Sequence, residues 1–472
     1  MTSPLERNVP PKFISILSVV TLIAFLPLLL FATYQSVILI TRASGTKAAI
    51  VVDTSSELET ITSDFYHAFA QGGEESKNMI APVLSEVTSL TPKIIRIDHI
   101  YDYHDVVTKK DGTLIFSFSK LDAIVDSIRA TGAVPLLSLS YMPPAIAKDG
   151  SVISIPNDWN EWAHVVERTI EHFSGKNERN LTGVYYEVWN EPDLEQFGNW
   201  KLSGEKNYLT LYHYAHIGAQ NAKNVQPFFL GGPSTTGLYK NWIIALTKSG
   251  DRVDFYSWHS YLADPKRFLT DQKNLVSWLL PYPNSILKPT LITEFGPSGS
   301  KNTAYGTMYG AAYTASVIRQ LISGGPAYLF TFELVDGPSE TEGKGWGLMT
   351  HPNQGKIKKP RFFLYQFLDD MMGKRIQLNG EGTWVTGFAT TRDSTIRTLL
   401  INFDAVGTHA ETVPITWKNL SPGNYHMTTQ CLLEKEQVSG LTVTASGIGE
   451  KKLYMPAQSV CKILLKKNSS TS

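Results

Sequence analysis

Two glutamates stand where an apolar stretch of the sequence gives way to polar residues. Glu191 ends the run "VYYEVWNE" and precedes a proline, and Glu294 ends the run "TLITE" and precedes "FGPSG". A single carboxylate in such a place can equally well be one half of a structural ion pair. Two of them, each at the end of its own apolar run, indicate a shared chemical task.

Paired carboxyl groups are what the cleavage of a glycosidic bond requires. One must be protonated to donate to the leaving oxygen, and the other must be ionised to attack the anomeric carbon. Burial and mutual repulsion push the pKa values of two such groups apart and so separate their roles. The 11% aromatic content is a weaker sign in the same direction, because aromatic rings stack on sugars, although they more often fill cores.

The two glutamates belong to a series of eight short apolar runs that alternate with longer amphipathic stretches. Such runs predict parallel strands covered by helices on their outer face. Eight units over about 300 residues favour a (β/α)8 TIM barrel over an open sheet, and no glycine-rich phosphate loop opens a helix. The predicted strands are 63–69, 93–98, 134–140, 184–190, 228–232, 253–259, 289–295 and 327–334.

The pattern changes near the C-terminus, where alternating strands follow one another without helices. This predicts an antiparallel β-sandwich accessory domain over 373–472. The barrel is predicted over 46–372, although its first strand-like segment, 47–52, is a candidate to join the sandwich. The segment 1–45 is predicted to be a cytoplasmic stub followed by a membrane anchor.

Residues 13–40 contain no charged side chain, and about 20 apolar residues suffice to cross a bilayer. They predict an N-terminal transmembrane helix, and hence a single-pass membrane protein whose catalytic domain is extracytoplasmic. The alternative is a cleaved signal peptide, but its apolar region should be about 7–15 residues long. Basic residues flank both ends of the segment, so the large domain behind it, more than the charge, suggests the orientation.

The carboxyl ends of barrel strands face the active site. Besides the glutamates, these ends supply Arg96, Asp98, Tyr141, Asn190, His259, Tyr261 and Phe332. Glu187 lies within its strand and is expected to be structural. His67, His99 and His104 are not arranged as a metal-ligand motif, so the sequence predicts neither a metal nor a cofactor.

The motifs around these residues resemble clan A glycoside hydrolases, and their finer pattern resembles glycoside hydrolase family 39. "EVWNEPD" and "LITEFGPSG" are similar to the clan's two catalytic segments, and "GGPS" is similar to the end of the family's fifth strand. "VDFYSWHSY" resembles the family's Asp-Phe-x-x-x-His-x-Tyr strand, and "GWGLMT" with "KKPRFFLYQFL" resembles the approach to the last barrel helix. The resemblance covers roughly residues 60–372, and a trailing β-sandwich also suits the family.

The resemblance implies a retaining glycoside hydrolase with Glu191 as general acid/base and Glu294 as nucleophile. Asn190 would bond the 2-hydroxyl of the sugar, an interaction that strengthens in the transition state. Relatives in the family include β-xylosidases, α-L-iduronidases and hydrolases of bacterial exopolysaccharides. The predicted membrane anchor favours an extracytoplasmic oligo- or polysaccharide as the substrate, of unspecified sugar and linkage.

Three further residues acquire roles from the same resemblance. Tyr261 would orient Glu294, His259 would line the same pocket, and Arg96 would lie beneath the nucleophile and keep it ionised. Two alternatives remain open, since Arg96 could pair structurally with Asp98 and His259 could be buried behind the pocket.

Two positions depart from the family pattern. Phe332 stands where the clan usually places a tryptophan at the end of the last strand, and "RIDH" places Asp98 where histidine is common. Both changes concern contacts with the substrate, and neither touches the glutamate pair. They put the specificity in doubt more than the reaction class.

Charge and cysteine content restrict the other classes of function. Lys+Arg and Asp+Glu are 43 each, and no basic stripe is present, so no nucleic-acid partner is expected. Cys431 and Cys461 are the two cysteines, and one disulfide or two buried thiols are equally compatible with the sequence. Two further hypotheses are another clan A activity, such as an endo-β-glucanase or a β-glucuronidase-like enzyme, and a non-catalytic carbohydrate-binding barrel.

Overall fold

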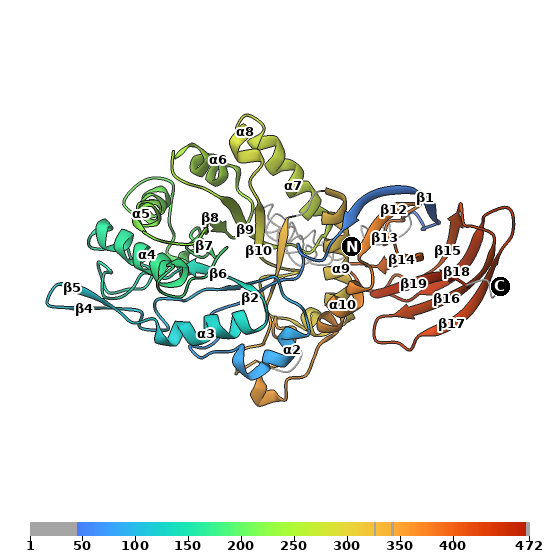
Figure 1. Ribbon diagram of the computed structural model, residues 1–472, viewed down its shortest axis with the longest axis horizontal. Coiled ribbons are helices and arrows are strands. Elements are labelled where there is room, and N and C mark those ends of the chain that lie inside the picture. The colour runs from blue at the N-terminus through green and yellow to red at the C-terminus, as the bar shows by residue number, and fades with distance from the viewer. Residues whose placement is uncertain (1–44, 325–326, 341–343, 469–472) are drawn as a thin grey trace, which may run out of the picture.

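The computed structural model describes residues 45–324, 327–340 and 344–468. Figure 1 shows a helix-covered barrel beside a second part made of strands, with α9 and α10 between them. The predicted (β/α)8 barrel and the predicted C-terminal β-domain are both confirmed.

Eight parallel strands close the barrel in the order β10-β11-β2-β3-β6-β7-β8-β9. Each overlaps one of the eight predicted runs. The first strand starts later than predicted, because residues 63–67 form a turn in which the backbone N–H groups of Tyr66 and His67 donate to the carbonyl of Ser63. The strands are β2 Ala68–Gln71, β3 Ile94–Ile97, β6 Val134–Leu139, β7 Tyr185–Val188, β8 Phe229–Thr235, β9 Phe255–Tyr261, β10 Thr290–Gly296 and β11 Tyr328–Phe332.

Apolar side chains fill the inside of the barrel, which is therefore a packed core and not a pore. They are Ala68, Ala70, Ile94, Leu136, Tyr185, Phe255, Leu291 and Phe330. A larger apolar cluster lies between the strands and the outer helices. Buried polar side chains, such as Arg96 of β3 and Glu187 of β7, lie above this apolar layer, toward the carboxyl ends of the strands.

Helices surround the barrel, and their apolar faces pack against it. In α4, for example, the Asp158 side chain caps the first turn by accepting from the backbone N–H of Asn160. The helices are α2 Leu84–Thr88, α3 Ser119–Ala130, α4 Trp159–Ser174, α5 Tyr208–Asn221, α6 Lys240–Lys248, α7 Lys266–Leu279, α8 Pro283–Ile286, α9 Met308–Gly324 and α10 Pro360–Asp369. Short 3-10 helices are η1 Ala81–Val83, η2 Glu195–Phe197, η3 Thr303–Gly306 and η4 Pro352–Gln354, and a hairpin of β4 Val107–Lys110 and β5 Thr113–Phe116 follows β3.

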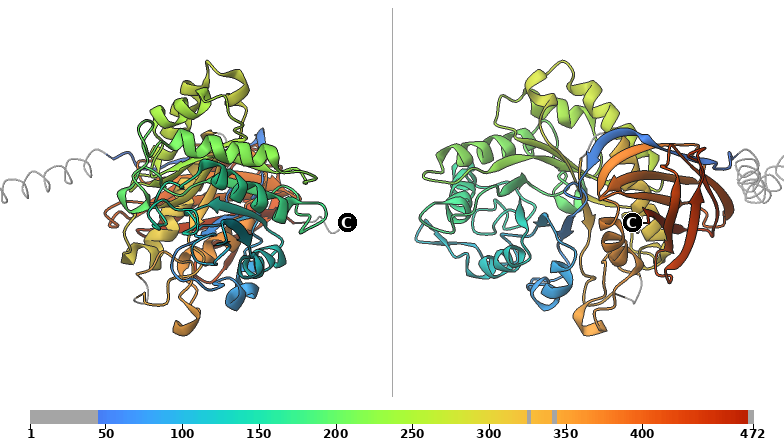
Figure 2. Two further views of the ribbon diagram at one scale, coloured as in Figure 1. Left: turned by 90° about the vertical axis from the view of Figure 1, so that its left-hand side faces the viewer. Right: turned by 45° about the vertical axis from the view of Figure 1, so that its right-hand side comes forward.

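The second part is a nine-stranded sheet in the order β17-β16-β19-β14-β13-β12-β1-β15-β18. The strands are β1 Ile50–Ile61, β12 Gly373–Asn379, β13 Val385–Arg392, β14 Thr395–Asn402, β15 Glu411–Lys418, β16 Gly423–Cys431, β17 Gln437–Val443, β18 Gly449–Met455 and β19 Ser459–Lys467. Strand β1 precedes the barrel in sequence but lies between β12 and β15, as the right-hand view of Figure 2 shows. Its pairing with β15 is parallel, so the sheet is mixed where the sequence indicated an antiparallel one.

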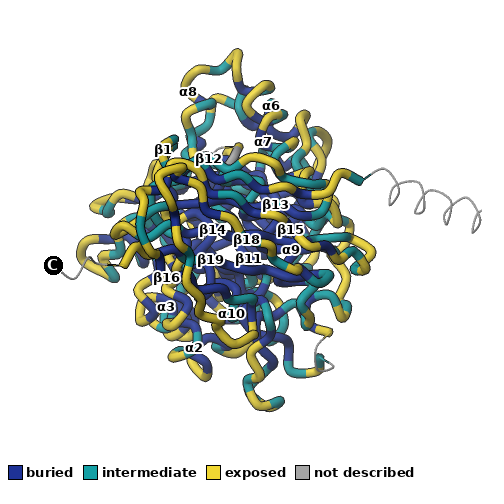
Figure 3. The backbone as a smooth tube through the Cα atoms, turned by 90° about the vertical axis from the view of Figure 1, so that its right-hand side faces the viewer, coloured by how far each residue is buried: buried dark blue, intermediate teal, exposed yellow. Residues whose placement is uncertain are grey.

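The sheet curves so that strands that are not neighbours face each other across an apolar core. The indole N–H of Trp417 in β15 donates to the hydroxyl of Thr398 in β14 over 3.0 Å, which ties the two faces together. Figure 3 shows the middle strands buried along most of their length and the outer loops exposed. Arg319 of α9 donates to Glu381 and to the carbonyl of Gly387, and thereby joins the barrel to the sheet.

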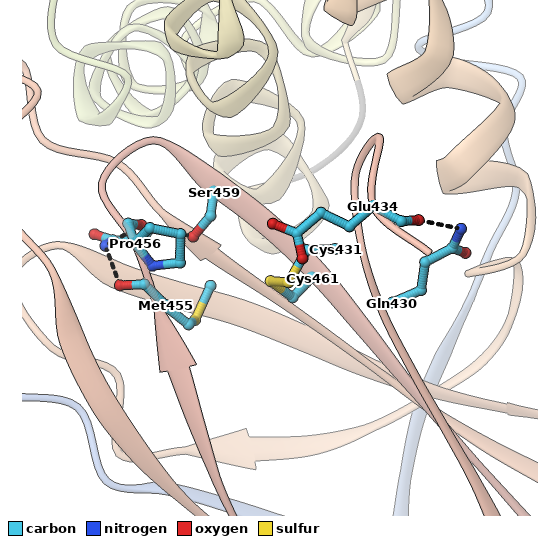
Figure 4. Close-up of a disulfide and its surroundings, with 8 residues drawn as sticks. Gln430, Cys431, Glu434, Met455, Pro456, Ser459 and Cys461 are labelled. Atoms are coloured by element: carbon cyan, nitrogen blue, oxygen red, sulfur yellow. Dashed lines mark hydrogen bonds between the residues drawn. A yellow bond between two sulfur atoms is a disulfide. The ribbon is translucent and has the colours of Figure 1, made fainter. Parts of the chain in front are cut away.

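A disulfide joins Cys431 of β16 to Cys461 of β19, which are neighbouring strands (Figure 4). Of the two states that the sequence left open, the structure therefore has the bonded one.

The predicted membrane anchor is not supported. Residues 13–40 lie outside the described part of the chain, and within 45–324, 327–340 and 344–468 no helix is long and apolar enough to cross a bilayer. This finding contradicts the prediction of a single-pass membrane protein with an extracytoplasmic catalytic domain.

Candidate active site

A cavity of about 470 Å³ opens at the carboxyl ends of the barrel strands. Its walls come from the ends of β9, β10 and β11 and from the loops after β2, β3, β7, β8, β10 and β11. The lining residues are Gly72, Gly73, Glu74, Asp98, His99, Asn190, Glu191, Leu194, Gln196, Phe197, Thr236, Tyr261, Glu294, Gly299, Phe332 and Trp346. Both glutamates singled out in the sequence are among them.

The chain is constrained where it leaves β7 and enters the cavity. Trp189 and Glu191 have φ angles of 74° and 43°, in the left-handed region that side chains disfavour. Hydrogen bonds fix this conformation: the carbonyl of Trp189 accepts from the Ser138 hydroxyl over 2.8 Å, and the N–H of Glu191 donates to the carbonyl of Ser234 over 2.9 Å. Such strain persists where the surroundings over-determine the backbone, which is a common property of functional sites.

Arg96 lies beneath the cavity and is 1% exposed. Its guanidinium donates to three acceptors: Nε to Glu187 Oε2 over 2.7 Å, Nη1 to Glu294 Oε1 over 2.9 Å, and Nη2 to Asn190 Oδ1 over 2.7 Å. The planar donor group of arginine suits this fixed geometry, whereas a lysine could not reproduce it. Arg96 therefore links the carboxyl-terminal regions of β7 and β10 at the site, and Glu187 is its structural partner.

Both carboxylate oxygens of Glu294 accept hydrogen bonds. Arg96 binds Oε1, and the hydroxyl of Tyr261 donates to Oε2 over 2.7 Å. Burial raises the pKa of Glu294, while the positive charges of His259 and Arg96 and the bond from Tyr261 act in the opposite direction. Burial also raises the pKa of Tyr261 well above its usual range, so its hydroxyl keeps the proton that it donates.

His259 connects the two glutamates from below. Its Nδ1 lies 2.8 Å from Glu191 Oε1 and 3.5 Å from Glu294 Oε2, and its Nε2 lies 3.3 Å from the Ser234 hydroxyl. Burial by itself lowers the pKa of His259, but the negative charges of Glu294 and Glu191 outweigh it, and the net shift is upward. A protonated His259 would balance part of the negative charge of the pair.

Asn190 is held from two sides. Its Oδ1 accepts from Arg96, and its Nδ2 donates to the hydroxyl of Tyr141 over 2.8 Å. Because an amide nitrogen carries two hydrogens, one remains for another acceptor. These contacts within the protein fix the orientation of the Asn190 side chain.

The structure brings all the sequence-predicted site residues together, in two layers. Asn190, Glu191, Tyr261, Glu294 and Phe332 line the cavity. Arg96, Tyr141 and His259 are buried behind its wall, where they contact other site residues. For His259 this is the alternative that the sequence left open. Arg96 forms its ion pairs with Glu187 and Glu294, and not with Asp98.

Several lining residues were not found from the sequence. Trp346 follows the last barrel strand and packs against Phe332 with ring centres 5.4 Å apart, so an indole does reach the cavity near that strand end. Similarly, His99 lines the cavity one position after Asp98. Trp346 could have been noticed as the tryptophan between two glycines in "KGWGLMT", but this segment is a loop whose path the sequence does not define.

One group of described residues has the spacing of a metal site: one ligand atom from each of Glu191, His259 and Glu294, all within 4.8 Å of one another. The surroundings do not suit a cation, because the Arg96 guanidinium already binds Glu294 at 2.9 Å. Both oxygens of Glu294 are also occupied as acceptors. The group is better explained as an interacting acid–base cluster.

A (β/α)8 barrel with two carboxylates facing each other from the ends of β7 and β10 defines a clan A glycoside hydrolase. Within this class the chain belongs to glycosyl hydrolases family 39, whose family model matches residues 88–401.

Two curated relatives are similar in sequence. A β-xylosidase from Caldicellulosiruptor saccharolyticus is 31% identical over 57% of this chain and 60% of its own length. A β-xylosidase from Geobacillus stearothermophilus is 26% identical over 60% of this chain and 62% of its own length. This chain therefore matches about three fifths of each relative.

Solved structures resemble the chain over most of its length. A monomeric β-xylosidase from Caulobacter crescentus CB15 has a TM-score of 0.73 at 19% identity, covering 89% of this chain and 100% of that one. The GH39 enzyme from Xanthomonas axonopodis pv. citri has a TM-score of 0.71 at 18% identity, covering 89% and 98%. At these identities the likeness establishes the fold alone.

Proposed function

We propose that the protein is a retaining glycoside hydrolase that cleaves an oligo- or polysaccharide by double displacement, with a β-xyloside as the first substrate to test. The observation that supports it most is the distance within the glutamate pair. One carboxylate oxygen of Glu191 and one of Glu294 lie within 4.8 Å of each other. Retaining enzymes place their carboxyl groups about 5–5.5 Å apart, whereas inverting enzymes need about 6.5–9.5 Å to admit a water molecule.

Glu294 suits the role of nucleophile. Arg96 and Tyr261 each bind one of its oxygens, so the carboxylate is oriented before the substrate arrives. The guanidinium and the imidazole of His259 favour the ionised form that must attack.

Glu191 suits the role of acid/base. Its side chain is 12% exposed, compared with 8% for Glu294, and it lies at the cavity wall next to the loop that carries Leu194 and Phe197. That loop provides an apolar surface for a leaving group. The second hydrogen of the Asn190 amide is available to bond the 2-hydroxyl of the sugar, an interaction that strengthens in the transition state.

The reaction proceeds in two steps. Glu294 forms an ester bond with the anomeric carbon as the glycosidic C–O bond breaks, and the leaving oxygen takes the proton of Glu191. Water then gives a proton to Glu191 while its oxygen attacks the same carbon, and Glu294 leaves as a carboxylate. The configuration at the anomeric carbon is inverted twice and thus retained.

The choice of a β-xyloside rests on the two curated relatives, both of which are β-xylosidases. An assay of the full chain on aryl β-xylosides and other aryl glycosides, with the product anomer followed by NMR, tests the reaction. In the Glu294→Ala variant, azide should restore turnover and yield the α-glycosyl azide. Initial release of an inverted sugar, or an unchanged rate in this variant, would contradict the proposal.

A further inference from the structure

Two more carboxylates line the cavity and have no part in the proposed mechanism. Glu74 follows β2, and Asp98 follows β3. In the closed barrel β2 lies three strands away from β7, which precedes Glu191, and β3 lies two strands away and carries Arg96, whose guanidinium binds the nucleophile Glu294. Because the leaving group must contact the acid, this side of the cavity receives the sugar that becomes bonded to Glu294.

The backbone makes room for both carboxylates. Asp98 Oδ1 accepts from the N–H of Gly73 over 3.1 Å, and a Cβ on Gly72 would lie 2.3 Å from the same oxygen. Glu74 Oε2 lies 3.2 Å from Lys301 Nζ, and a Cβ on Gly337 would lie 2.3 Å from it. Side chains other than glycine at these positions would displace the carboxylates.

The charge on this wall is negative. Among the described residues that line the cavity there is no lysine or arginine. Lys301 lies behind the wall, paired with Glu74 and Glu340 and with its Nζ 4.5 Å above the Trp346 ring, so two carboxylates surround one ammonium group. His99 is the remaining lining residue that could carry a positive charge, and its Nδ1 lies 2.7 Å from a carboxylate oxygen of Asp102.

We infer that the subsite beside Glu294 takes a terminal sugar that bears hydroxyl groups and no carboxylate, and that Glu74 and Asp98 select it. Carboxylate oxygens accept hydrogen bonds from sugar hydroxyls, whereas a uronic acid would place a third negative charge in the same half-buried space. This inference rests on the proposed function, because the mechanism decides which side of the cavity receives the sugar. Within the family, this preference would distinguish an enzyme that acts on neutral glycosides from one that acts on uronides.

Matched aryl glycosides test the inference, for example a β-glucoside and a β-glucuronide, which differ only in the substituent at C5. We expect kcat/KM for the neutral member of each pair to be higher by roughly 100-fold, the size of one like-charge contact at about 6 Å in a medium with an effective dielectric constant of about 20. Glu74→Gln and Asp98→Asn should each reduce this ratio about 10-fold. Glu75→Gln is the control, because Glu75 faces Lys77 and His351 and does not line this cavity.

Binding of the corresponding aryl thioglycosides, which the enzyme cannot hydrolyse readily, separates this inference from the proposed function. If no O-glycoside is cleaved, the proposed function fails, but calorimetry of the thioglycosides still measures the preference. A thioglucuronide that binds as tightly as the thioglucoside, or failure of every neutral thioglycoside to bind, would overturn the inference. An equal change of the ratio in the Glu75→Gln control would also contradict it.

Discussion

Replacing Tyr261 with phenylalanine removes one hydroxyl from Glu294 and leaves the ring in the cavity wall. The hydroxyl donates to Glu294 Oε2 over 2.7 Å and lowers the pKa of that carboxyl, against the upward effect of burial. Its loss raises the pKa further. Because only the ionised carboxylate can attack, the acid limb of the kcat/KM profile should move to higher pH.

The magnitude follows from the type of hydrogen bond that is lost. A bond to a charged group contributes about 1.5–3 kcal/mol, which corresponds to a fall of about 10- to 150-fold in kcat/KM at neutral pH. The same energy sets an upper limit of about 1–2 units for the shift of the acid limb. The assay is the pH dependence of kcat/KM on an activated aryl glycoside.

Tyr141→Phe is the matched control, since it also removes a buried hydroxyl from the site. That hydroxyl bonds the Asn190 amide over 2.8 Å and neither glutamate. This variant should lower kcat/KM without moving the acid limb. A Tyr261→Phe enzyme with an unmoved acid limb and a loss below about 3-fold would refute the reasoning about Glu294.

Three other predictions concern a buried glutamate, the disulfide and a glycine in the cavity wall. Burial raises the pKa of Glu333 well above 4.5, so the folded chain keeps a proton that the unfolded chain releases, and the free energy of unfolding falls as the pH rises. In urea unfolding, the stability of the Glu333→Gln variant relative to wild type should therefore grow by about 1.4 kcal/mol per pH unit above 4.5. An equal difference between the two proteins at pH 5 and pH 7 would contradict this. Cys431 and Cys461 are 30 residues apart, and replacing both with alanine should lower the free energy of unfolding by about 2–4 kcal/mol with kcat/KM unchanged. Gly72→Ala should displace Asp98 and lower kcat/KM about 10- to 100-fold without loss of folding by circular dichroism.

The barrel was predictable because parallel strands that are buried on both faces read as continuous apolar runs. All eight appear in the structure in the predicted order. The position of β1 was harder to predict from the sequence, since its partners β12 and β15 follow the whole barrel in the chain. Only tertiary contacts decide that its pairing with β15 is parallel.

The membrane prediction failed for a different reason. It was based on the composition of 13–40 alone, and the described residues contain no helix that could cross a bilayer. The composition of a segment shows that it is apolar, but it does not show whether a bilayer or another apolar surface surrounds it.

The site could be predicted in part. Strand ends identified the residues that surround the cavity, but not which of them reach its surface. The three bonds of Arg96 and the position of His259 between the glutamates depend on how strands distant in sequence close the barrel. Trp346 was missed because long loops, unlike strands, have no periodic pattern that places their side chains.

The central claim is that Glu294 becomes covalently bonded to the sugar. An activated 2-deoxy-2-fluoro xyloside slows the second step, so that the intermediate accumulates. We expect the intact mass to increase by one fluoroxylosyl unit and peptide mapping to place it on Glu294, with no label in the Glu294→Gln chain. Labelling of Glu191 or of another residue, or turnover of unmodified xylosides with inversion and no label at all, would contradict the account.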